Sequence, residues 1–338
     1  MSANTFLIKM TSKCNLNCLH CYDLKTNEDM SEDVLDKVIE YIKKCILNTN
    51  EEQYIINVVG GEISLYNQKM IKKMVSSFDL IRKTKSIKFI YQSNLIYKMS
   101  EETIETIKLF DEFGTSFDYS IRFRKEDDKK IWLNNLKLIQ NVMENVRVTV
   151  TLTKLFIEHF TPSELIDFML DLGIHNIEMN IMFPTVDGRN VKYLMPKNEN
   201  LREWLYKCFL YYKQKQKETK LTMMNLDCLE NSFNGIFGWE HGRTCCEDTR
   251  TFLPDGKIAT CILLQNKVFY DLNTNTELMP IEDLYAQEKQ LNLICYKCKY
   301  LNLCKGGCQI NPFDDTGCAV PYKVYEYLEM KREMENNE

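Results

Sequence analysis

Three cysteines near the N-terminus carry the clearest chemical meaning in this chain. Cys14, Cys18 and Cys21 follow the spacing C-x3-C-x2-C, so three thiolates are available within one short segment and no fourth adjoins them. An iron–sulfur cluster with four irons, held by three protein thiolates, keeps one iron open for another ligand. An open position distinguishes catalytic from structural metal sites, so the spacing predicts a reactive site. A zinc site or free reactive thiols are the alternative, although zinc sites usually have four ligands.

The spacing resembles the signature of the radical S-adenosylmethionine (radical SAM) superfamily. The resemblance implies that the open iron binds the amino and carboxylate groups of SAM, and that one-electron reduction then releases a 5′-deoxyadenosyl radical. His20 and Tyr22 flank the third cysteine of the motif. The resemblance implies a cofactor contact for Tyr22. A histidine at position 20 is also typical of an ordinary packed loop, and we assign it no chemistry.

Length and composition describe a globular protein without a nucleic-acid or membrane partner. The 338 residues are 44% hydrophobic and 27% charged, which suffices for a barrel-sized domain plus a smaller module. The formal net charge of −5 offers no basic surface for nucleic acid. No apolar stretch approaches the roughly 20 residues that span a bilayer, and the N-terminus lacks a signal peptide. We therefore expect a cytoplasmic location, where fourteen cysteines indicate metal binding rather than disulfides.

β-Branched or aromatic runs alternate with amphipathic segments over residues 5–220. The runs predict strands at 6–10, 54–59, 87–91, 116–121, 146–152 and 177–183. The segments between them predict helices near 31–47, 67–83, 100–113, 130–144, 162–172 and 198–219. Six such units favour an α/β fold with a parallel sheet, as in a partial (β/α)6 TIM-like barrel. The radical SAM resemblance implies the same fold, and a doubly wound open sheet is the alternative.

Functional residues of such folds lie at the carboxyl ends of the strands, and the cysteine motif follows the first strand. The second strand ends in Gly60, Gly61 and Glu62. Two glycines let the backbone approach a ligand closely, and the carboxylate can accept hydrogen bonds from an ammonium group. The segment resembles the family's Gly-Gly-Glu-Pro motif for the SAM amino group, with Ile63 in place of proline.

The third and fourth strands also end in polar residues. The third ends in Gln-Ser-Asn-Leu95, similar to the family's Gln-Thr-Asn-Gly, and the fourth carries Ser-Phe-Asp-Tyr119, similar to Ser-Leu-Asp-Gly. Leucine replaces the first glycine, from which we expect a different turn. Polar caps of strand ends would look the same. The resemblance implies contacts with SAM or substrate for four residues: Ser93, Asn94, Ser116 and Asp118.

Eight further cysteines gather beyond residue 244: Cys245, Cys246, Cys261, Cys295, Cys298, Cys304, Cys308 and Cys318. Their pattern resembles the SPASM extension, which binds two auxiliary [4Fe–4S] clusters in radical SAM enzymes that mostly modify peptides and proteins. The resemblance implies three clusters in all. It assigns the second auxiliary cluster to Cys295, Cys298, Cys304 and Cys318, and the first to Cys246, Cys261 and Cys308. Cys245, Cys228 or an open iron would complete the first cluster, and a zinc module is the alternative. We expect the barrel over residues 1–230 and the SPASM-like domain over 231–338.

Three cysteines lie outside these groups. Cys45 and Cys208 fall in expected helices and are predicted core residues. Cys228 follows an expected strand over Leu221–Leu226, near the expected mouth of the barrel. A thiol there is a candidate catalytic donor of a hydrogen atom to a substrate radical, and a buried or cluster-binding cysteine is the alternative.

The leading hypothesis is a radical SAM enzyme that modifies a ribosomally made precursor peptide by crosslinking or epimerisation. Its partners would be that peptide and an electron donor such as flavodoxin or ferredoxin. The first strand begins by residue 6, so leader recognition would use the barrel surface or a separate leader-binding protein. An anaerobic sulfatase-maturating enzyme is disfavoured, because that class has an acidic residue where Ile262 follows Cys261. A non-catalytic iron–sulfur electron carrier would need neither the open cluster nor Gly60–Glu62.

Overall fold

The computed structural model describes residues 3–23, 26–183, 185–186, 189–236, 245–288, 291–308, 310 and 312–336. The chain divides into two compact units, and each unit is built from several stretches of the sequence. The first comprises Met1–Ser116, Ser120–Val146 and Cys246–Gln287, and the second comprises Phe117–Tyr119, Arg147–Cys245 and Glu288–Glu338. No helix in the described ranges is long and apolar enough to cross a membrane.

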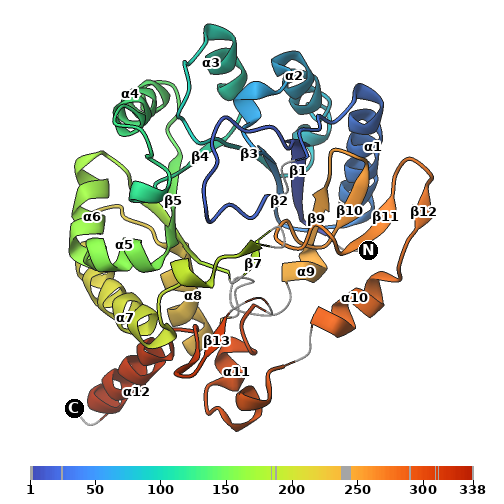
Figure 1. Cartoon of the computed structure of the whole chain (residues 1–338). Helices are drawn as coiled ribbons and strands as arrows, with labels where there is room; N and C mark the ends of the chain where they lie inside the picture. The colour runs from blue at the N-terminus through green and yellow to red at the C-terminus, as the bar shows by residue number, and fades with distance from the viewer. Residues whose placement is uncertain are drawn as a thin grey trace. The chain divides into compact units, whose positions relative to one another are not determined.

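Four parallel strands form the middle of the first unit. They pair in chain order as β1 (Thr5–Thr11), β2 (Tyr54–Gly60), β3 (Ile87–Gln92) and β4 (Glu112–Ser116). Figure 1 shows helices along one side of these strands, namely α1 (Glu32–Asn48), α2 (Gln68–Ser76), α3 (Glu101–Ile107) and α4 (Asp128–Gln140). Ser31 caps α1 by accepting a hydrogen bond from the Val34 backbone, as a serine before an apolar helix is expected to do.

A C-terminal stretch of the chain extends this sheet beyond β1. Strand β9 (Thr249–Phe252) pairs with β1 in parallel, and β10 (Lys257–Ala259), β11 (Val268–Asp271) and β12 (Thr276–Glu277) follow antiparallel (Figure 1). The ring of Phe252 packs 6.4 Å from that of Phe6, centroid to centroid. The segment that carries Cys261 is therefore part of the same sheet as the strand that precedes Cys14. Two helices flank these strands, α9 (Cys245–Asp248) and α10 (Ile281–Glu288).

The two faces of β1 and β2 differ in burial. Phe6, Ile8 and Met10 are fully buried, while Leu7 between them is partly exposed. In β2, Ile56 and its neighbours two residues away are buried and the residues between them are partly exposed. Parallel strands are usually buried on both faces, because helices cover both. Here the opposite face is half-buried at Leu7, Ile55 and Asn57, and buried at Lys9 and Thr11.

The second unit contains the parallel pair β5 (Val146–Leu152) and β6 (Asn176–Ile181). Its two hairpins are β7 (Thr185–Val186) with β8 (Arg189–Asn190), and β13 (Phe313–Asp314) with β14 (Gly317–Cys318). Its helices are α5 (Lys154–His159), α6 (Pro162–Asp171), α7 (Asn198–Lys215), α8 (Met224–Phe233), α11 (Leu301–Cys304) and α12 (Tyr322–Asn336). Along the chain as a whole, the structure also describes short 3-10 helices at Ile63–Leu65, Ile81–Lys83, Tyr119–Ile121, Lys192–Leu194 and Leu293–Lys297. Thr161 and Glu164 form a reciprocal capping box at the start of α6.

Five of the six predicted barrel strands are confirmed within two residues. The strand predicted over 116–121 is wrong, because β4 ends at Ser116 and a 3-10 helix covers Tyr119–Ile121. The helix predicted over 100–113 is too long, because α3 ends at Ile107 and β4 already begins at Glu112. The strand predicted over Leu221–Leu226 is also wrong: α8 begins at Met224, and Thr222 makes a single bridge to Asn176.

Candidate functional site

The cysteine motif lies in the loop that follows β1. Cys14 and Cys21 are half-buried, Cys18 is buried, and none of the three is part of a disulfide. The Cys21 amide donates to the Cys18 carbonyl over 3.2 Å, and the Leu16 amide donates to the Cys14 sulfur over 3.4 Å. Amide donors beside a sulfur favour its thiolate form, the form that binds iron.

Gly60, the last residue of β2, and Gly61 lie against the start of this loop. The Gly61 amide donates to the Thr11 carbonyl over 2.8 Å, and the Glu62 amide donates to the Lys13 carbonyl over 2.7 Å. A side chain on Gly61 would place its Cβ 2.3 Å from the Lys13 carbonyl oxygen. Glycine is therefore required here because two backbones meet, which fixes the position of the cysteine loop relative to β2.

The Glu62 carboxylate joins the ends of β2 and β3. Its Oε1 accepts hydrogen bonds from the Ser64 amide over 3.0 Å and the Ser93 hydroxyl over 2.8 Å, and its Oε2 accepts from the Asn94 amide over 2.7 Å. Burial raises the pKa of Glu62, and these hydrogen bonds act in the opposite direction. Only 1% of the residue is exposed. A carboxylate offers about four acceptor positions, so these bonds leave room for about one further donor.

Asn94 connects the turn after β3 to the cysteine motif. Its side-chain amide donates to Oδ1 of Asn15 over 2.9 Å and lies 3.9 Å from the Cys14 sulfur. The side-chain amide of Asn15 in turn donates to the Ile96 carbonyl over 2.6 Å. Leu95 has a φ of 59°, the left-handed conformation that glycine favours. The leucine thus adopts a backbone conformation that a glycine at this position could also adopt.

The other two predicted strand-end contacts belong to different units. Ser116 is half-buried at the end of β4 in the first unit. Asp118, in the second, is buried, and its Oδ1 accepts from the Thr151 amide over 2.8 Å. Tyr119 also has a left-handed backbone, with a φ of 46°, and its ring stacks on His159 at 3.9 Å. The Asp118 carboxylate therefore binds the backbone of β5.

Tyr22 stands near thiols from two of the predicted groups. Desolvation raises the pKa of the Tyr22 hydroxyl most, and the charges of Asp23, Cys21 and Cys261 raise it further. The residue nevertheless exposes 38% of its surface. Cys261 is half-buried, and its sulfur accepts from the Leu263 amide over 3.4 Å. The loop after β10 thus brings Cys261 to the end of the cysteine motif.

Four cysteines of the second unit share one neighbourhood. Burial raises the pKa of both Cys304 and Cys318, and the charges of Cys295 and Cys298 raise each of them further. The Gly306 amide donates to the Cys304 sulfur over 3.4 Å. These are the residues that the sequence grouped as one cluster site. Cys308 is half-buried in the same unit, and the side chains of Cys245 and Cys246 lie outside the described residues.

Two side chains from the first turns of α7 hold the hairpin that carries Cys318. The Asn198 side chain donates to the Pro312 and Gly317 carbonyls over 3.0 and 2.8 Å. The buried Arg202 guanidinium donates to the Cys318 carbonyl over 2.6 Å and to the Thr316 carbonyl over 2.8 Å. A planar guanidinium is well suited to hold two acceptors at once, so Arg202 fixes the backbone at Cys318.

Cys228 lies in α8 rather than after a strand, and 8% of it is exposed. Burial raises the pKa of the Tyr325 hydroxyl on α12 to about 12, and the charges of Cys304 and Cys228 raise it as well. Cys228 therefore lies near α12 and the cysteine-rich region. Cys208 is fully buried, as predicted for a core residue, and Cys45 is half-buried in α1.

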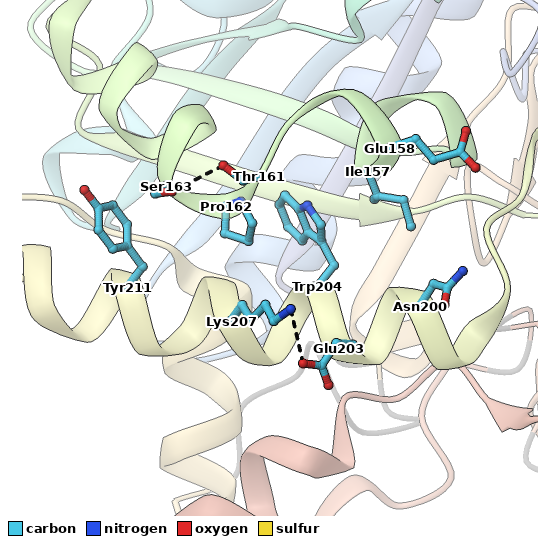
Figure 2. A pocket seen from close by; sticks show the side chains of 10 residues that line it. All are labelled: Ile157, Glu158, Thr161, Pro162, Ser163, Asn200, Glu203, Trp204, Lys207 and Tyr211. Carbon is cyan, nitrogen blue, oxygen red and sulfur yellow. Dashed lines mark hydrogen bonds and ion pairs between the residues drawn. The ribbon is translucent and has the colours of Figure 1, made fainter.

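A groove of about 520 Å³ lies between α5, α6 and α7 in the second unit (Figure 2). Trp204 and Pro162 contribute apolar surface, and Glu203 pairs with Lys207 over 3.4 Å. No predicted site residue lines this groove, so it has no part in the candidate site. Within the described ranges, no three His, Cys, Asp or Glu side chains converge closely enough to hold a single metal ion.

Sequence reasoning missed a buried polar group beside the motif. Lys9 of β1 forms an ion pair with Asp23, and its ammonium also donates to the Gln265 side chain over 2.8 Å. A lysine within an apolar strand was the available signal, but its partners are distant in the sequence.

Two comparisons of sequence bear on the site. Residues 5–142 match a family described as a 4Fe-4S single cluster domain. An uncharacterised protein of Methanocaldococcus jannaschii is 27% identical over 247 residues, which cover 70% of this chain and 82% of that protein. The family match includes the cysteine motif, Gly60–Glu62 and the strand ends around Asn94.

Solved structures share the fold over most of the chain. One is anSMEcpe with bound AdoMet and a Cp18Cys peptide, with a TM-score of 0.77, 16% identity, and coverage of 99% of each chain. Another is Streptococcus suis SuiB bound to its precursor peptide SuiA, with a TM-score of 0.65, 17% identity, and coverage of 91% of this chain and 72% of that one. The predicted α/β fold, a partial barrel with a cysteine-rich C-terminal region, is confirmed. The 4Fe-4S family match and the shared fold agree with the resemblance of the sequence to radical SAM proteins with a SPASM-like region.

Proposed function

We propose that this chain is a radical SAM enzyme that modifies a peptide by removing a hydrogen atom from one of its carbons. The observation that carries the proposal is the convergence of three strand ends on one motif. Gly61 and Glu62 bind the backbone of the cysteine loop, and Asn94 reaches from β3 to the Cys14 side of it. Carboxyl ends of parallel strands are where such folds bind their ligands.

The residues present fit an iron–sulfur cluster and SAM. Cys14, Cys18 and Cys21 would hold the cluster, because three thiols lie in one short loop and the Leu16 amide donates to the Cys14 sulfur. When bound, the cluster and SAM supply the 5′-deoxyadenosyl radical. Glu62 has about one acceptor position left for the amino group of SAM. Further contacts to SAM or substrate are proposed for Tyr22, Ser93, Asn94, Ser116 and Asp118.

Two auxiliary [4Fe–4S] clusters complete the proposal. The shared neighbourhood of the four cysteines in the second unit supports one of them, at Cys295, Cys298, Cys304 and Cys318. The other is proposed at Cys246, Cys261 and Cys308, with Cys245 or Cys228 as a further ligand. The low exposure of Cys228 favours a ligand or packing role over a hydrogen-atom donor. A barrel over 1–230 and a SPASM-like region over 231–338 stay a prediction from the sequence, and the compact units of the structure divide the chain differently, with 246–287 in the first unit.

A peptide substrate is supported by the peptides bound to anSMEcpe and SuiB. The proposed modification is a thioether or carbon–carbon crosslink, or epimerisation. Ile262 after Cys261 provides no carboxylate, which argues against oxidation of the sulfatase-maturase type. A flavodoxin or ferredoxin as electron donor, a separate leader-binding protein and a cytoplasmic location belong to the same proposal.

The test is to incubate the reconstituted, reduced protein with SAM and to measure 5′-deoxyadenosine. We expect this product from the wild-type chain and none after Cys14, Cys18 and Cys21 are replaced with alanine. The matched control is Cys45→Ala, which removes a half-buried thiol from α1. A non-catalytic electron carrier would bind iron and release no 5′-deoxyadenosine, so this result would replace the enzyme hypothesis.

A further inference from the structure

A buried polar network connects three distant parts of the first unit. Lys9 lies in β1, Asp23 follows the cysteine motif, and Gln265 follows Cys261. Lys9 and Asp23 form an ion pair, and the Lys9 ammonium donates to Oε1 of Gln265 over 2.8 Å. The side-chain amide nitrogen of Gln265 lies 3.4 Å from Oδ1 of Asp23. The exposed fractions are 3% for Lys9, 3% for Asp23 and 8% for Gln265.

Burial makes this network expensive to form. Two charges removed from water lose their hydration, and their mutual attraction offsets that loss only when further hydrogen bonds complete the geometry. Apolar side chains of similar volume often stabilise such a position as well or better. The ion pair is therefore poor evidence for a purely stabilising role, and what it specifies is an arrangement of chain segments.

Gln265 also shapes the turn that carries Cys261. Its amide donates to the Ile262 carbonyl over 3.0 Å, which closes the chain back on itself. Within the same turn, the Leu264 amide donates to the Cys261 carbonyl over 3.1 Å and the Leu263 amide to the Cys261 sulfur over 3.4 Å. One side chain thus binds the Cys261 turn on one side and the residues beside Cys21 on the other.

We infer that the Lys9–Asp23–Gln265 network fixes the Cys261 turn against the end of the cysteine motif, with Gln265 as its positioning residue. The proximity of Tyr22 to both Cys21 and Cys261 agrees with this arrangement. The network would set the spacing between the SAM-binding cluster and the first auxiliary cluster. That consequence rests on the proposed function, whereas the fixed turn does not.

Hydrogen exchange on the cluster-free protein tests the turn directly. Gln265→Leu removes the hydrogen bonds of the amide and leaves the Lys9–Asp23 pair in place. We expect exchange at the amides of Leu263 and Leu264 to become about tenfold faster, the loss expected when about one hydrogen bond no longer opposes local opening. Exchange within β1 should stay as in the wild type, which separates local release from general destabilisation.

Gln68→Leu is the matched control, because Gln68 is equally buried in the same unit and donates to the Tyr66 carbonyl over 2.9 Å. We expect it to leave exchange at Leu263 and Leu264 unchanged. Unchanged exchange at these amides in Gln265→Leu, or equal acceleration in both variants, would overturn the inference. A double variant, Lys9→Met with Asp23→Leu, removes both charges together and should also free the turn even where its melting temperature equals that of the wild type.

The loaded protein provides a second measurement. In Gln265→Leu we expect the electron paramagnetic resonance signal of the first auxiliary cluster to shift or disappear, while SAM still perturbs the signal of the N-terminal cluster. An unaltered auxiliary signal would contradict the positioning role. If the wild-type protein binds no clusters or cleaves no SAM, the proposed function fails, and the exchange data still decide whether the network holds the turn.

Discussion

Among single residues, Glu62 should make stability depend on pH in an unusual direction. Burial raises its pKa above the ordinary 4.5, so the folded protein holds this proton more tightly than the unfolded chain does. Its contribution to stability therefore falls as the pH rises from about 4.5 through the raised value. We expect the free energy of unfolding of Glu62→Gln, relative to the wild type, to improve over this range. Urea unfolding of both cluster-free proteins at several pH values measures this difference in the free energy of unfolding. A difference that stays constant with pH would contradict the raised pKa of Glu62.

At position 95, a glycine variant should be more stable than an alanine variant, which is the reverse of the usual order. The side chain is fully buried and the backbone is left-handed, a conformation that costs a non-glycine residue about 1 kcal/mol. Both Leu95→Ala and Leu95→Gly lose the packing, but only glycine relieves the backbone. We expect the glycine variant to be the more stable by about 1 kcal/mol in thermal unfolding. Leu136, buried within α4, is the control, and there alanine should be favoured by about the same amount.

Residues of the candidate site differed in how far the sequence could predict their surroundings. The link between Glu62 and Asn94 was foreseeable in kind, because both follow strands whose carboxyl ends meet at one edge of a sheet. The partner of Lys9 was not, because Gln265 lies 256 positions away and no local pattern encodes that contact. The backbone of Leu95 could not be foreseen either, since a leucine in a left-handed conformation is uncommon, and here its side chain is fully buried.

Elements were predicted well where the burial pattern was clear and poorly where it was weak. β5 was placed to the residue, because valines and threonines alternate through it. β4 was displaced by several residues, since Glu112 and Gly114 are poor strand formers and the aromatic residues after Ser116 are better ones. Tertiary contact decides this case: Lys88 pairs with Glu112 over 2.6 Å, and the Gln92 side chain occupies the space beside Gly114.

The start of α7 should control binding of iron at the second auxiliary site. Arg202→Leu leaves the carbonyls of Cys318 and Thr316 without their buried donor, at a cost of about 1–3 kcal/mol each. We expect the variant to lose about one cluster's iron while SAM cleavage by the N-terminal cluster persists. Iron and sulfide analysis after reconstitution measures this. Lys207→Met, an exposed change on the same helix, should bind iron as the wild type does, and full iron content in Arg202→Leu would refute the role of the arginine.

At the scale of the whole molecule, the sheet joins parts of the chain that are about 240 residues apart in the sequence. β9 pairs in parallel with β1, and Phe252 packs between Phe6 and Tyr41 in the core of the first unit. A barrel that ended at residue 230 would lose this strand and expose the edge of β1. The segment 246–287 therefore supports the N-terminal strands as well as presenting Cys261.

Phe252→Ala tests this dependence, because it changes a residue far beyond position 230. Truncation of a buried phenylalanine costs about 3–5 kcal/mol, and the loss should be felt in β1, where the ring packs. We expect faster hydrogen exchange throughout Thr5–Thr11 in the variant. Leu278→Ala, an exposed change in the same segment, should leave β1 protected. Protection of β1 that survives Phe252→Ala would mean that residues 1–230 are stable by themselves, and that β9 only rests on a sheet that is already complete.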